Sequence, residues 1–456
     1  MDLTVVILAA GKGTRMRSAL PKVLHKLADK PLVQHVIDTA KSLNPNKIVV
    51  VYGHGGDIVP QTINDPSIQW VEQKEQLGTG HAVAQAVDAL DDSGRILVLY
   101  GDVPLVQQST LSALVAQLDD ENVGVSLLTA VLTDATGYGR IVRDHQHRVA
   151  RIVEHKDANE AELAVKEVNT GILAASYADL CGWLKRLENN NAQGEYYLTD
   201  IIGMSVNDGK PVEASIIQRE WEMAGVNNKK QLAELERQHQ RNIAEQLMDN
   251  GVTLMDPARL DVRGVLNAGR DVTIDVNAVF LGEVTLGDNV QIGPNCVIKN
   301  CRIADNVSIH ANSVLEDSII DTGCDIGPFA RIRPDSHLMA NAKVGNFVEV
   351  KKSIIGEGSK VNHLSYVGDT TMGANVNIGA GTITCNYDGA NKYKTIIEDD
   401  VFVGSDTQLV APVTVAKGTT IGAGSTITKD TPAGKLTLSR SKQITLDGWQ
   451  RPVKKK

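Results

Sequence analysis

The sequence predicts two domains of different classes: an α/β domain with a Rossmann-like, mostly parallel sheet, followed by a parallel β-helix of six-residue repeats. Three observations support this prediction. Apolar runs alternate with helical segments in the first half. The stretch 229–249 contains neither Gly nor Pro. After it, aliphatic residues return at every sixth position. The length of 456 residues also exceeds the roughly 250–300 that one core usually holds.

Four apolar runs in the first half are predicted strands, at 3–10, 47–52, 95–100 and 123–132. Helical patterns lie between them, for example at 31–43 and 80–90. Unbroken apolar strands that alternate with helices indicate a parallel sheet covered on both faces. Three of these runs end in Gly beside a polar or charged residue. Because ligands bind at the carboxyl ends of such strands, we expect a binding site at this edge.

A single connecting helix is predicted at 228–250, since its apolar residues recur at near-helical spacing and Asn250-Gly251 would end it. The first domain is therefore expected at 1–227 and the β-helix at 251–437. The remaining residues, 438–456, form a basic tail.

The repeat region shows a six-residue period that fits neither a helix nor a simple strand. Each aliphatic side chain is expected to point inward and stack on the next coil, with Gly and Asn at the corners. The phase slips once, between Ile298 and Ile303, and the repeat breaks at 386–394, where we expect a projecting loop. The stacked positions are Phe280, Leu286, Ile292 and Ile298; Val314, Ile320, Ile326, Ile332, Leu338, Val344 and Val350; and Val403, Leu409, Val415, Ile421 and Ile427.

Composition narrows the function. The net charge of −9 disfavours nucleic acid as a partner, although it allows small anionic substrates in a local basic pocket. The five cysteines form no CxxC pair, which argues against a zinc site or a disulfide framework and favours a reducing cytoplasm. No run approaches the roughly 20 apolar residues of a membrane span.

A glycine-rich loop, Gly11-Lys12-Gly13, follows the first strand, and Leu20-Pro21-Lys22 follows it closely. Glycines let backbone N–H groups approach an anion, and basic side chains then hold phosphates. Met16 replaces the third Gly of a dinucleotide fingerprint, and the spacing is not that of a P-loop. The combination instead resembles the sugar-nucleotide pyrophosphorylase signature, which implies nucleotidyl transfer with Arg15 and Lys22 as the catalytic cations.

Asp102 ends the third predicted strand beside this loop, where a carboxylate is well placed to hold Mg²⁺ together with substrate phosphates. The resemblance implies Asn227 as the second metal ligand, although Asn227 could instead only cap the connecting helix. The resemblance also implies a set of nucleotide- and sugar-binding residues. They are Leu8, Ala9, Ala10, Gly11, Gln73, Gly78, Thr79, Tyr100, Gly101, Asp102, Gly139, Glu154, Asn169 and Asn227.

Polar residues that break the repeat point to chemistry in the β-helix. His363 stands among them, and the cluster resembles the hexapeptide acyltransferases, in which a histidine is the general base. An imidazole suits this role because it titrates near neutral pH. The implied sugar-phosphate site comprises Arg333, Lys351, Tyr366, Asn377 and Lys392. The implied acetyl-coenzyme A site comprises Ala380, Asn386, Tyr387, Ser405, Ala423 and Arg440.

Both halves together resemble the bifunctional bacterial N-acetylglucosamine-1-phosphate uridylyltransferase/glucosamine-1-phosphate N-acetyltransferase family. This resemblance implies a left-handed β-helix after an α/β nucleotidyltransferase domain. It implies acetylation of glucosamine 1-phosphate by acetyl-coenzyme A, followed by Mg²⁺-dependent UMP transfer from UTP with release of pyrophosphate. The product would supply peptidoglycan and lipopolysaccharide synthesis. Homotrimers with acetyltransferase sites between subunits are also implied.

Two other functions compete with this interpretation. The β-helix could serve only as a trimerisation and regulatory module for the nucleotidyltransferase, although a cluster around a histidine base would then have no purpose. A γ-class carbonic anhydrase-like metal site would need three converging histidines. The repeat region offers His310, His337 and His363, whose coil positions are scattered.

Overall fold

The computed structural model describes residues 2–454. Residue 1 of the predicted first domain and residues 455–456 of the predicted basic tail lie outside the described residues. The chain divides into two compact units between His239 and Gln240. Each unit has its own hydrophobic core.

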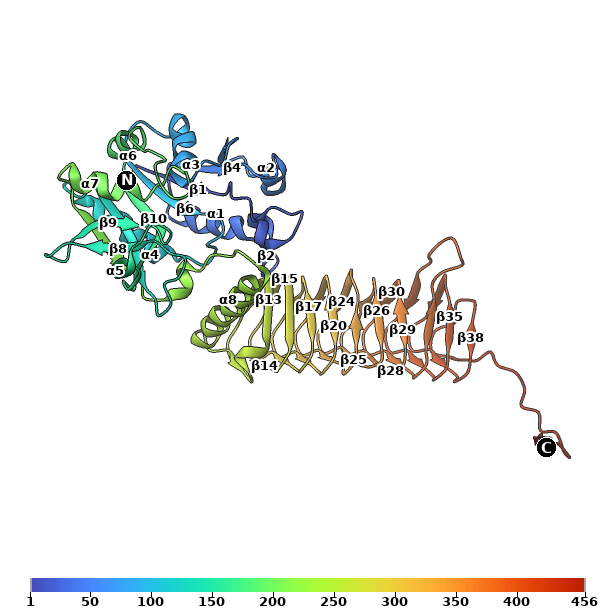
Figure 1. Ribbon diagram of the computed structural model, residues 1–456. Helices are drawn as coiled ribbons and strands as arrows, with labels where there is room; N and C mark the ends of the chain where they lie inside the picture. The colour runs from blue at the N-terminus through green and yellow to red at the C-terminus, as the bar shows by residue number, and fades with distance from the viewer. Residues whose placement is uncertain (1, 455–456) are drawn as a thin grey trace. The chain divides into compact units, whose positions relative to one another are not determined.

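The first unit contains a nine-stranded sheet with the order β11-β7-β10-β6-β1-β4-β5, to which β8 and β9 attach (Figure 1). Strand β1 pairs in parallel with β4 and β6, as predicted, whereas β10 runs antiparallel to both of its neighbours. The strands are β1 (Leu3–Leu8), β4 (Lys47–Tyr52), β5 (Ile68–Glu72), β6 (Arg95–Tyr100), β7 (Val125–Val131), β8 (Arg140–Arg143), β9 (Val149–Val153), β10 (Glu167–Ser176) and β11 (Val212–Ile216); β2 (Lys26–Leu27) and β3 (Lys30–Pro31) form a separate hairpin.

Helices cover both faces of this sheet, as the unbroken apolar strands predicted. All six residues of β1 are buried because its side chains alternate between two cores. Val36 of α1 and Leu114 of α4 pack into one core, and Val83 of α3 and Leu180 of α6 pack into the other. The helices are α1 (Leu32–Ser42), α2 (Ile58–Ile63), α3 (Thr79–Ala86), α4 (Gln108–Ala116), α5 (Glu160–Leu163), α6 (Tyr177–Leu184) and α7 (Asp200–Asn207).

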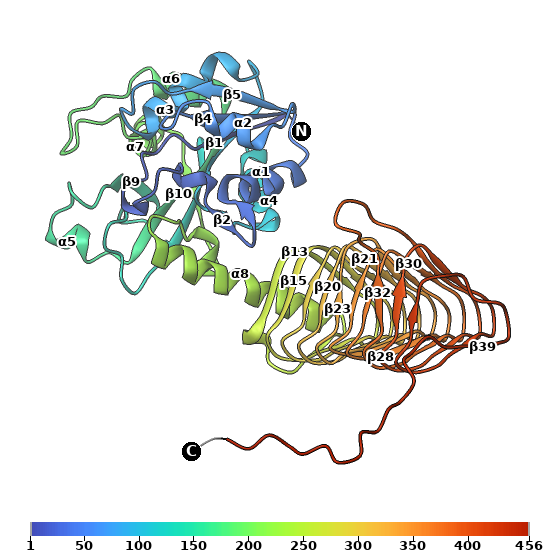
Figure 2. The same cartoon turned by 90° about the vertical axis from the view of Figure 1, so that its right-hand side faces the viewer.

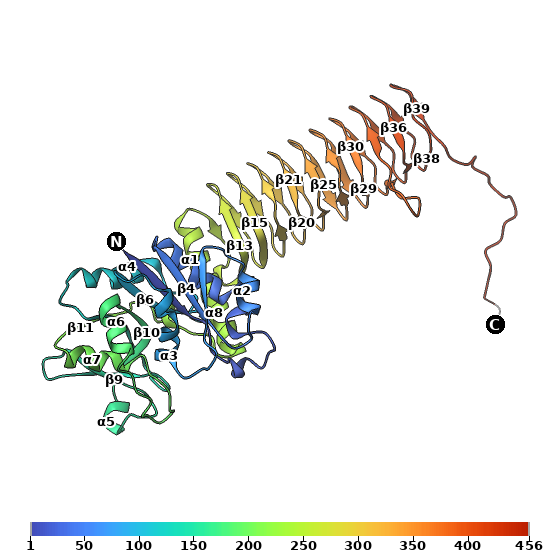
Figure 3. The same ribbon diagram turned by 90° about the horizontal axis from the view of Figure 1, so that it is seen from above.

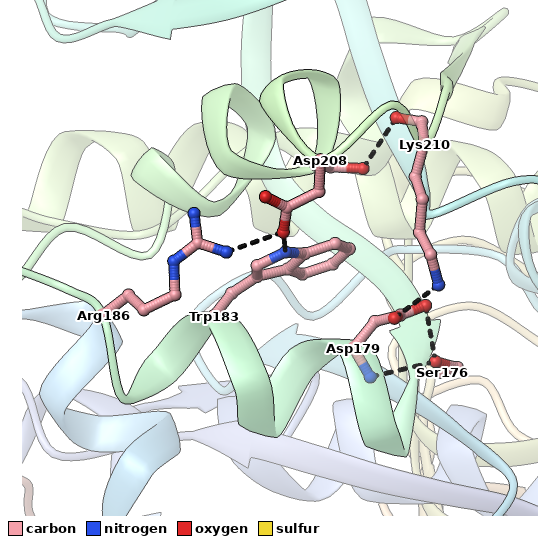
Figure 4. Close-up of polar contacts among 7 residues, drawn as sticks. Ser176, Asp179, Trp183, Arg186, Asp208 and Lys210 are labelled. Carbon is pink, nitrogen blue, oxygen red and sulfur yellow. Dashed lines mark hydrogen bonds and ion pairs between the residues drawn. The ribbon is translucent and has the colours of Figure 1, made fainter.

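A polar network fixes α6 against the end of α7 (Figure 4). Asp208 accepts hydrogen bonds from the indole N–H of Trp183 (2.9 Å) and from Arg186 (2.6 Å), and the Arg186 bond holds the Asp208 pKa below its usual range. Asp179 pairs with Lys210 at 2.5 Å, and its backbone N–H donates to the N-cap hydroxyl of Ser176. The network secures the outer helical layer and takes no part in the binding edge of the sheet.

Helix α8 (Lys229–Asp249) has a part in each unit. In the first unit, Leu235 packs with Met16 and Leu27. In the second, Leu247 joins the β-helix core, and the side chain of Gln240 exchanges two hydrogen bonds with the backbone of Val262, at 2.7 and 2.8 Å. The absence of Gly and Pro allows one continuous helix to serve both cores.

The second unit is a left-handed parallel β-helix whose coils stack along one axis (Figures 2 and 3). One face is an 11-stranded parallel sheet, and the other two faces form a continuous 17-stranded sheet. The first face contains β12 (Thr253–Leu254), β14 (Thr273–Ile274), β16 (Gln291–Ile292), β19 (Ser308–Ile309), β22 (Asp325–Ile326), β25 (Lys343–Asn346), β28 (Lys360–His363), β31 (Asn377–Ile378), β34 (Phe402–Val403), β37 (Thr420–Ile421) and β39 (Leu436–Thr437). The other faces contain β13 (Leu260–Ala268), β15 (Ala278–Leu286), β17 (Val297–Lys299), β18 (Arg302–Ile303), β20 (Val314–Glu316), β21 (Ser318–Ile320), β23 (Arg331–Ile332), β24 (Ser336–Leu338), β26 (Glu349–Lys351), β27 (Ile354–Ile355), β29 (Tyr366–Gly368), β30 (Thr370–Met372), β32 (Ile383–Cys385), β33 (Thr395–Ile397), β35 (Gln408–Val410), β36 (Val413–Val415) and β38 (Thr426–Ile427).

The predicted inward stack is present, with two corrections. Val314 is only half-buried, and Leu315 takes its place in the core. The five-residue spacing predicted once, between Ile298 and Ile303, recurs along the helix. The reason is a corner made by a single residue with left-handed backbone, which shortens the repeat by one. These corner residues are Asn300, Asp317, Lys352 and Asp369, with φ values of 49°, 43°, 47° and 48°.

The predicted loop at 386–394 leaves the coils between β32 and β33 and projects from the stack (Figure 1). A bridge between Tyr387 and Lys392 closes it. None of the helices within residues 2–454 combines the length and apolar character needed to cross a membrane.

Candidate active sites

A cleft of about 440 Å³ opens at the carboxyl ends of β1 and β6 in the first unit. It forms because β1 and β6 are adjacent and the glycine-rich loop continues directly from β1, with Gly101 N–H donating to the Leu8 carbonyl at 2.9 Å. Ten of the predicted site residues line this cleft: Leu8, Ala9, Ala10, Gly11, Lys22, Gln73, Gly78, Thr79, Tyr100 and Asp102.

The glycine-rich loop packs directly against Lys22. Gly13 has φ 57°, and a Cβ atom there would come within 2.7 Å of the Lys22 Cβ. Glycine is therefore required at this position by both backbone conformation and space. This close contact explains why the motifs Gly11-Lys12-Gly13 and Leu20-Pro21-Lys22 occur together in the sequence.

A cationic centre lies at the floor of the cleft. The Lys22 ammonium forms an ion pair with the Asp102 carboxylate and donates to the Asn227 amide oxygen at 3.3 Å. Arg15 also donates to that oxygen, at 2.9 Å. The backbone N–H of Val226 donates to the Asp102 carbonyl at 2.9 Å, which ties the two oxygen-bearing segments together.

The donor set at this centre fits Mg²⁺. Asp102 and Asn227 present a carboxylate and an amide oxygen to one position, and the Lys22 ammonium already lies between them as a cation. Mg²⁺ commonly uses one or two protein oxygens and completes its shell with water and substrate phosphates. The alternative that Asn227 only caps α8 is wrong, because the capping side chain is that of Asn228, whose Oδ1 accepts from the N–H groups of Lys230 and Gln231 at 2.9 and 3.0 Å. The backbone N–H of Asn227 donates to the side-chain oxygen of Gln231 at 2.8 Å.

Gln73 lines the same cleft as the glycine-rich loop. Its buried amide donates to the Gly78 carbonyl at 3.2 Å and contacts His81 Nδ1 at 3.0 Å. Gly78 has φ 112°, and a Cβ atom there would lie 2.6 Å from the Tyr196 carbonyl. These contacts hold the segment before α3 in one conformation and leave the edge of the cleft rigid.

Gly139, Glu154 and Asn169 come together although they lie on different strands or loops. The Asn169 N–H donates to the Gly139 carbonyl at 2.9 Å, and a Cβ atom at Gly139 would lie 3.4 Å from both carboxylate oxygens of Glu154. Gly171 is also constrained, since a side chain there would strike the ring of Tyr100. Burial raises the pKa of Tyr100, so its hydroxyl stays a neutral donor.

Burial also raises the pKa of Glu154, against the lowering effect of a 3.0 Å hydrogen bond from Thr199. A folded-state pKa above the unfolded value means that Glu154 costs stability once the unfolded carboxyl ionises, and costs nothing below that pH. We expect Glu154→Gln to raise the calorimetric unfolding midpoint of the first unit by about 2 °C near pH 8. The gain should shrink as the solution is acidified. Glu188→Gln, at an exposed residue of the same surface, is the control; a lower midpoint for Glu154→Gln would contradict the expectation.

In the β-helix, the predicted sugar-phosphate residues gather at one corner of the coils. The ammonium of Lys392, from the projecting loop, lies so close to that of Lys351 that it lowers the Lys351 pKa. Arg333 lies beside them and pairs with Glu349 at 2.6 Å. Two adjacent ammonium groups repel each other, and an anion bound between them would offset that repulsion. The cluster is therefore suited to bind a phosphate group. Asn377 lies apart, on the first face.

His363 heads a column at the next corner. The Gly381 N–H donates to the His363 carbonyl, Asp406 N–H to Ala380, and Gly424 N–H to Ser405, at 3.4, 2.7 and 2.8 Å. The Arg440 guanidinium donates to the Ala423 carbonyl at 2.9 Å. The predicted acetyl-coenzyme A residues Ala380, Ser405, Ala423 and Arg440 thus occupy successive coils beyond His363. They make a track of small side chains that ends in a cation.

The histidines of the alternative metal-site interpretation do not share a position. His310 pairs with Asp325 at 2.6 Å, His337 on β24 pairs with Asp321 at 2.8 Å, and His363 lies at the end of β28. His337 therefore lies on a different face from His363.

Sequence reasoning missed two contacts. Asn346 Oδ1 lies 3.0 Å from His363 Nδ1, and the Asp369 carboxylate accepts from the Asn386 amide at 2.5 Å. Both partners lie one coil earlier, 17 positions before the residue they touch. Once the length of a coil is known, this spacing of 17 residues would have allowed both contacts to be predicted from the sequence.

Comparison with known proteins agrees with this architecture. Residues 5–163 match a MobA-like NTP transferase domain, residues 262–336 a GMPPB C-terminal domain, and residues 394–429 bacterial transferase hexapeptide repeats. The chain is 59% identical over 454 residues to the bifunctional protein GlmU of Ralstonia pickettii, covering 100% of this chain and 99% of that protein. This chain belongs to the GlmU family. The GlmU protein of Marinobacter nauticus is likewise 59% identical over 452 residues, with 99% of each chain covered.

These relatives are named as bifunctional proteins, and the matched models are an NTP transferase domain and transferase hexapeptide repeats. This chain is a bifunctional uridylyltransferase and acetyltransferase. A crystal structure of UDP-glucose pyrophosphorylase complexed with UDP-glucose covers 53% of this chain at a TM-score of 0.44 and 16% identity, a likeness too distant to add to the argument.

Proposed function

We propose that the β-helix transfers the acetyl group of acetyl-coenzyme A to glucosamine 1-phosphate, and that the first unit then transfers UMP from UTP to the product. One observation supports this proposal above all. The centre formed by Lys22 and Asp102 lies in one unit of the chain, and the column of coils that begins at His363 lies in the other. Residues 1–227 are assigned to uridylyl transfer and 251–437 to acetyl transfer, with 228–250 as the connecting helix and 438–456 as the tail that supplies Arg440.

In uridylyl transfer, a phosphate oxygen of the sugar 1-phosphate attacks the α-phosphorus of UTP, and pyrophosphate leaves. Lys22 and Arg15 stabilise the phosphates and orient the leaving group. Mg²⁺, held by Asp102 and Asn227, would supply charge neutralisation on the phosphate oxygens. Gln73 and Gly78 orient the base, while Gly139, Glu154 and Asn169 receive the sugar.

In acetyl transfer, the substrate amine attacks the thioester carbonyl, and the C–S bond then breaks to release the coenzyme A thiol. His363 accepts the amine proton. The Asn346 amide oxygen accepts a hydrogen bond from Nδ1–H, which favours the tautomer with Nε2 free to act as the base. Arg333, Lys351 and Lys392 receive the phosphate, and the column from Ala380 to Arg440 receives the coenzyme.

The assay that tests this proposal supplies glucosamine 1-phosphate, acetyl-coenzyme A, UTP and Mg²⁺ and follows free thiol and pyrophosphate separately. Both products are expected. Pyrophosphate from N-acetylglucosamine 1-phosphate without any thiol release would reduce the β-helix to a scaffold. Thiol release without pyrophosphate would contradict the uridylyl half. Replacement of UTP by other nucleoside triphosphates tests the base preference.

The proposal includes a homotrimer formed through the β-helix. At one column of corners, Asn277, Asn295 and Asn312 carry hydrogen-bonded side chains, but the next two coils carry Phe329 and Phe347. The two phenyl rings stack at 5.2 Å and are 48% and 55% exposed. Bulky residues rarely adopt the left-handed backbone of these corners, with φ 55° at both. Two exposed phenyl rings held in this unfavourable backbone conformation are best explained if a second copy of the chain buries them.

We expect Phe347→Glu to shift the protein from trimer to monomer in analytical ultracentrifugation, because a buried unpaired carboxylate opposes association. Thiol release should fall at least tenfold in the monomer. The His363 column and the Lys351 cluster lie at different corners of one chain, so we expect one acetyl-transfer site to be formed by two subunits. Pyrophosphate release should persist. Asn312→Asp, at the same column, is the control. An intact trimer in Phe347→Glu would remove the two phenyl rings from the interface.

A cytoplasmic location also forms part of the proposal. All five cysteines are free thiols, and four are buried. Free thiols are kept in this state in a reducing compartment.

A further inference from the structure

Residues at both ends of the projecting loop at 386–394 contact the same residue of the coils, Asp369. Asn386, at its start, donates through its amide to the Asp369 carboxylate at 2.5 Å. Thr395, directly after its end, donates through its N–H to the Asp369 carbonyl at 3.2 Å. The two ends of the insert that carries Tyr387 and Lys392 therefore meet at Asp369.

Asp369 differs from the other residues of its corner column. Asn300, Asp317, Asp335 and Lys352 occupy equivalent corners with positive φ and are all exposed. Asp369 is 8% exposed and its partner Asn386 is 7% exposed. Backbone conformation alone would be satisfied by Asn at such a corner. A buried carboxylate is costly unless it is hydrogen-bonded and serves a nearby cation, so its charge needs a reason.

The cation cluster supplies that reason. Lys351 faces Lys392 and Arg333, which both disfavour its charged form, and Asp369 is the carboxylate that favours it. Arg333 already has its own counter-charge in Glu349, at 2.6 Å, and also faces Tyr366. Asp369 thus partly offsets the repulsion that the Lys351 ammonium feels from Lys392 and Arg333.

We propose that Asp369 is a positioning residue of the acetyl-transfer site, whose buried carboxylate fixes Asn386 and the base of the 386–394 loop and supports the Lys351 ammonium that faces Lys392. This inference rests on the proposed acetyltransferase function of the β-helix. Asp369 acts through these residues and is not assigned a contact with substrate.

The test compares Asp369→Ala, Asp369→Asn and the control Asp335→Asn in the full-length protein. Asp369→Ala leaves the Asn386 amide unpaired, so the KM for acetyl-coenzyme A should rise about tenfold or more, as expected for a lost charged hydrogen bond. Uridylyl transfer by the same chain should stay within twofold of wild type. Asp335→Asn should change neither activity.

Asp369→Asn keeps the corner and an acceptor for Asn386 but removes the charge. The KM for acetyl-coenzyme A should therefore recover to near the wild-type value. Because an ammonium without its counter-charge loses its proton more readily, the alkaline limb of kcat/KM for glucosamine 1-phosphate should move to lower pH. A purely structural role would leave that limb unchanged.

An unshifted limb in Asp369→Asn together with a wild-type KM for acetyl-coenzyme A in Asp369→Ala would overturn the inference. If Asp369→Ala does not fold, the pH profile of Asp369→Asn decides alone. Failure of the underlying function is distinguishable, because the wild-type protein would then release no thiol at all.

Discussion

Replacement of His363 by alanine should reduce acetyl transfer by roughly 10²- to 10⁴-fold, the usual contribution of a positioned general base. The amine of the substrate is protonated near neutral pH and becomes a nucleophile only when a base removes its proton. His363 is exposed at the end of β28, and its Nδ1 is engaged by Asn346 at 3.0 Å, so Nε2 is the nitrogen left for this task.

The measurement is thiol release from acetyl-coenzyme A with glucosamine 1-phosphate, alongside pyrophosphate release from supplied N-acetylglucosamine 1-phosphate and UTP. The second activity should be unchanged, which excludes global unfolding. Asn346→Ala should lose about tenfold, since it removes the tautomer preference but not the base. His337→Ala, at a histidine paired with Asp321, is the matched control. Full thiol release by the His363 variant would refute its assignment as the base.

Asp102→Asn should lower uridylyl transfer by roughly 10²- to 10³-fold, comparable to the loss of one preorganised charge-stabilising group. The substitution keeps the shape of the side chain but removes the carboxylate that faces both Lys22 and the position fitted for Mg²⁺. Lys22 also loses its counter-charge, so the phosphate-binding end of the cleft is altered twice. Acetyl transfer should be unaffected, because we assign it to the other unit.

Pyrophosphate release is measured over a series of Mg²⁺ concentrations, where the variant should need more Mg²⁺ for its half-maximal rate. Chelation of Mg²⁺ from wild type should stop pyrophosphate release and leave thiol release intact. Asp65→Asn is the matched control, because Asp65 forms an ion pair with Lys41 at the surface. Wild-type rates and Mg²⁺ dependence in Asp102→Asn would refute a metal-binding role.

The sequence patterns by themselves predicted the fold class of both units, a mostly parallel α/β sheet and a parallel β-helix, while the left-handed form of the β-helix came from the family resemblance. Each depends on a short-range pattern: unbroken apolar strands between helices in the first half, and the six-residue period in the second. Such patterns report directly which side chains are buried. The glycine-rich loop was also predictable from sequence, because its left-handed backbone at Gly13 and the close approach of Lys22 leave room only for glycine there.

The tertiary structure decided what depends on residues far apart in the chain. Lys22 and Asn227 are 205 positions apart, yet they share one hydrogen bond. The antiparallel direction of β10 is likewise invisible in its apolar composition, because a strand buried on both faces reads the same in either direction. Asp369 looks like any other corner residue in sequence. Only the fold of the 386–394 insert over it buries its charge, and burial is what turns a common corner residue into a candidate part of the acetyl-transfer site.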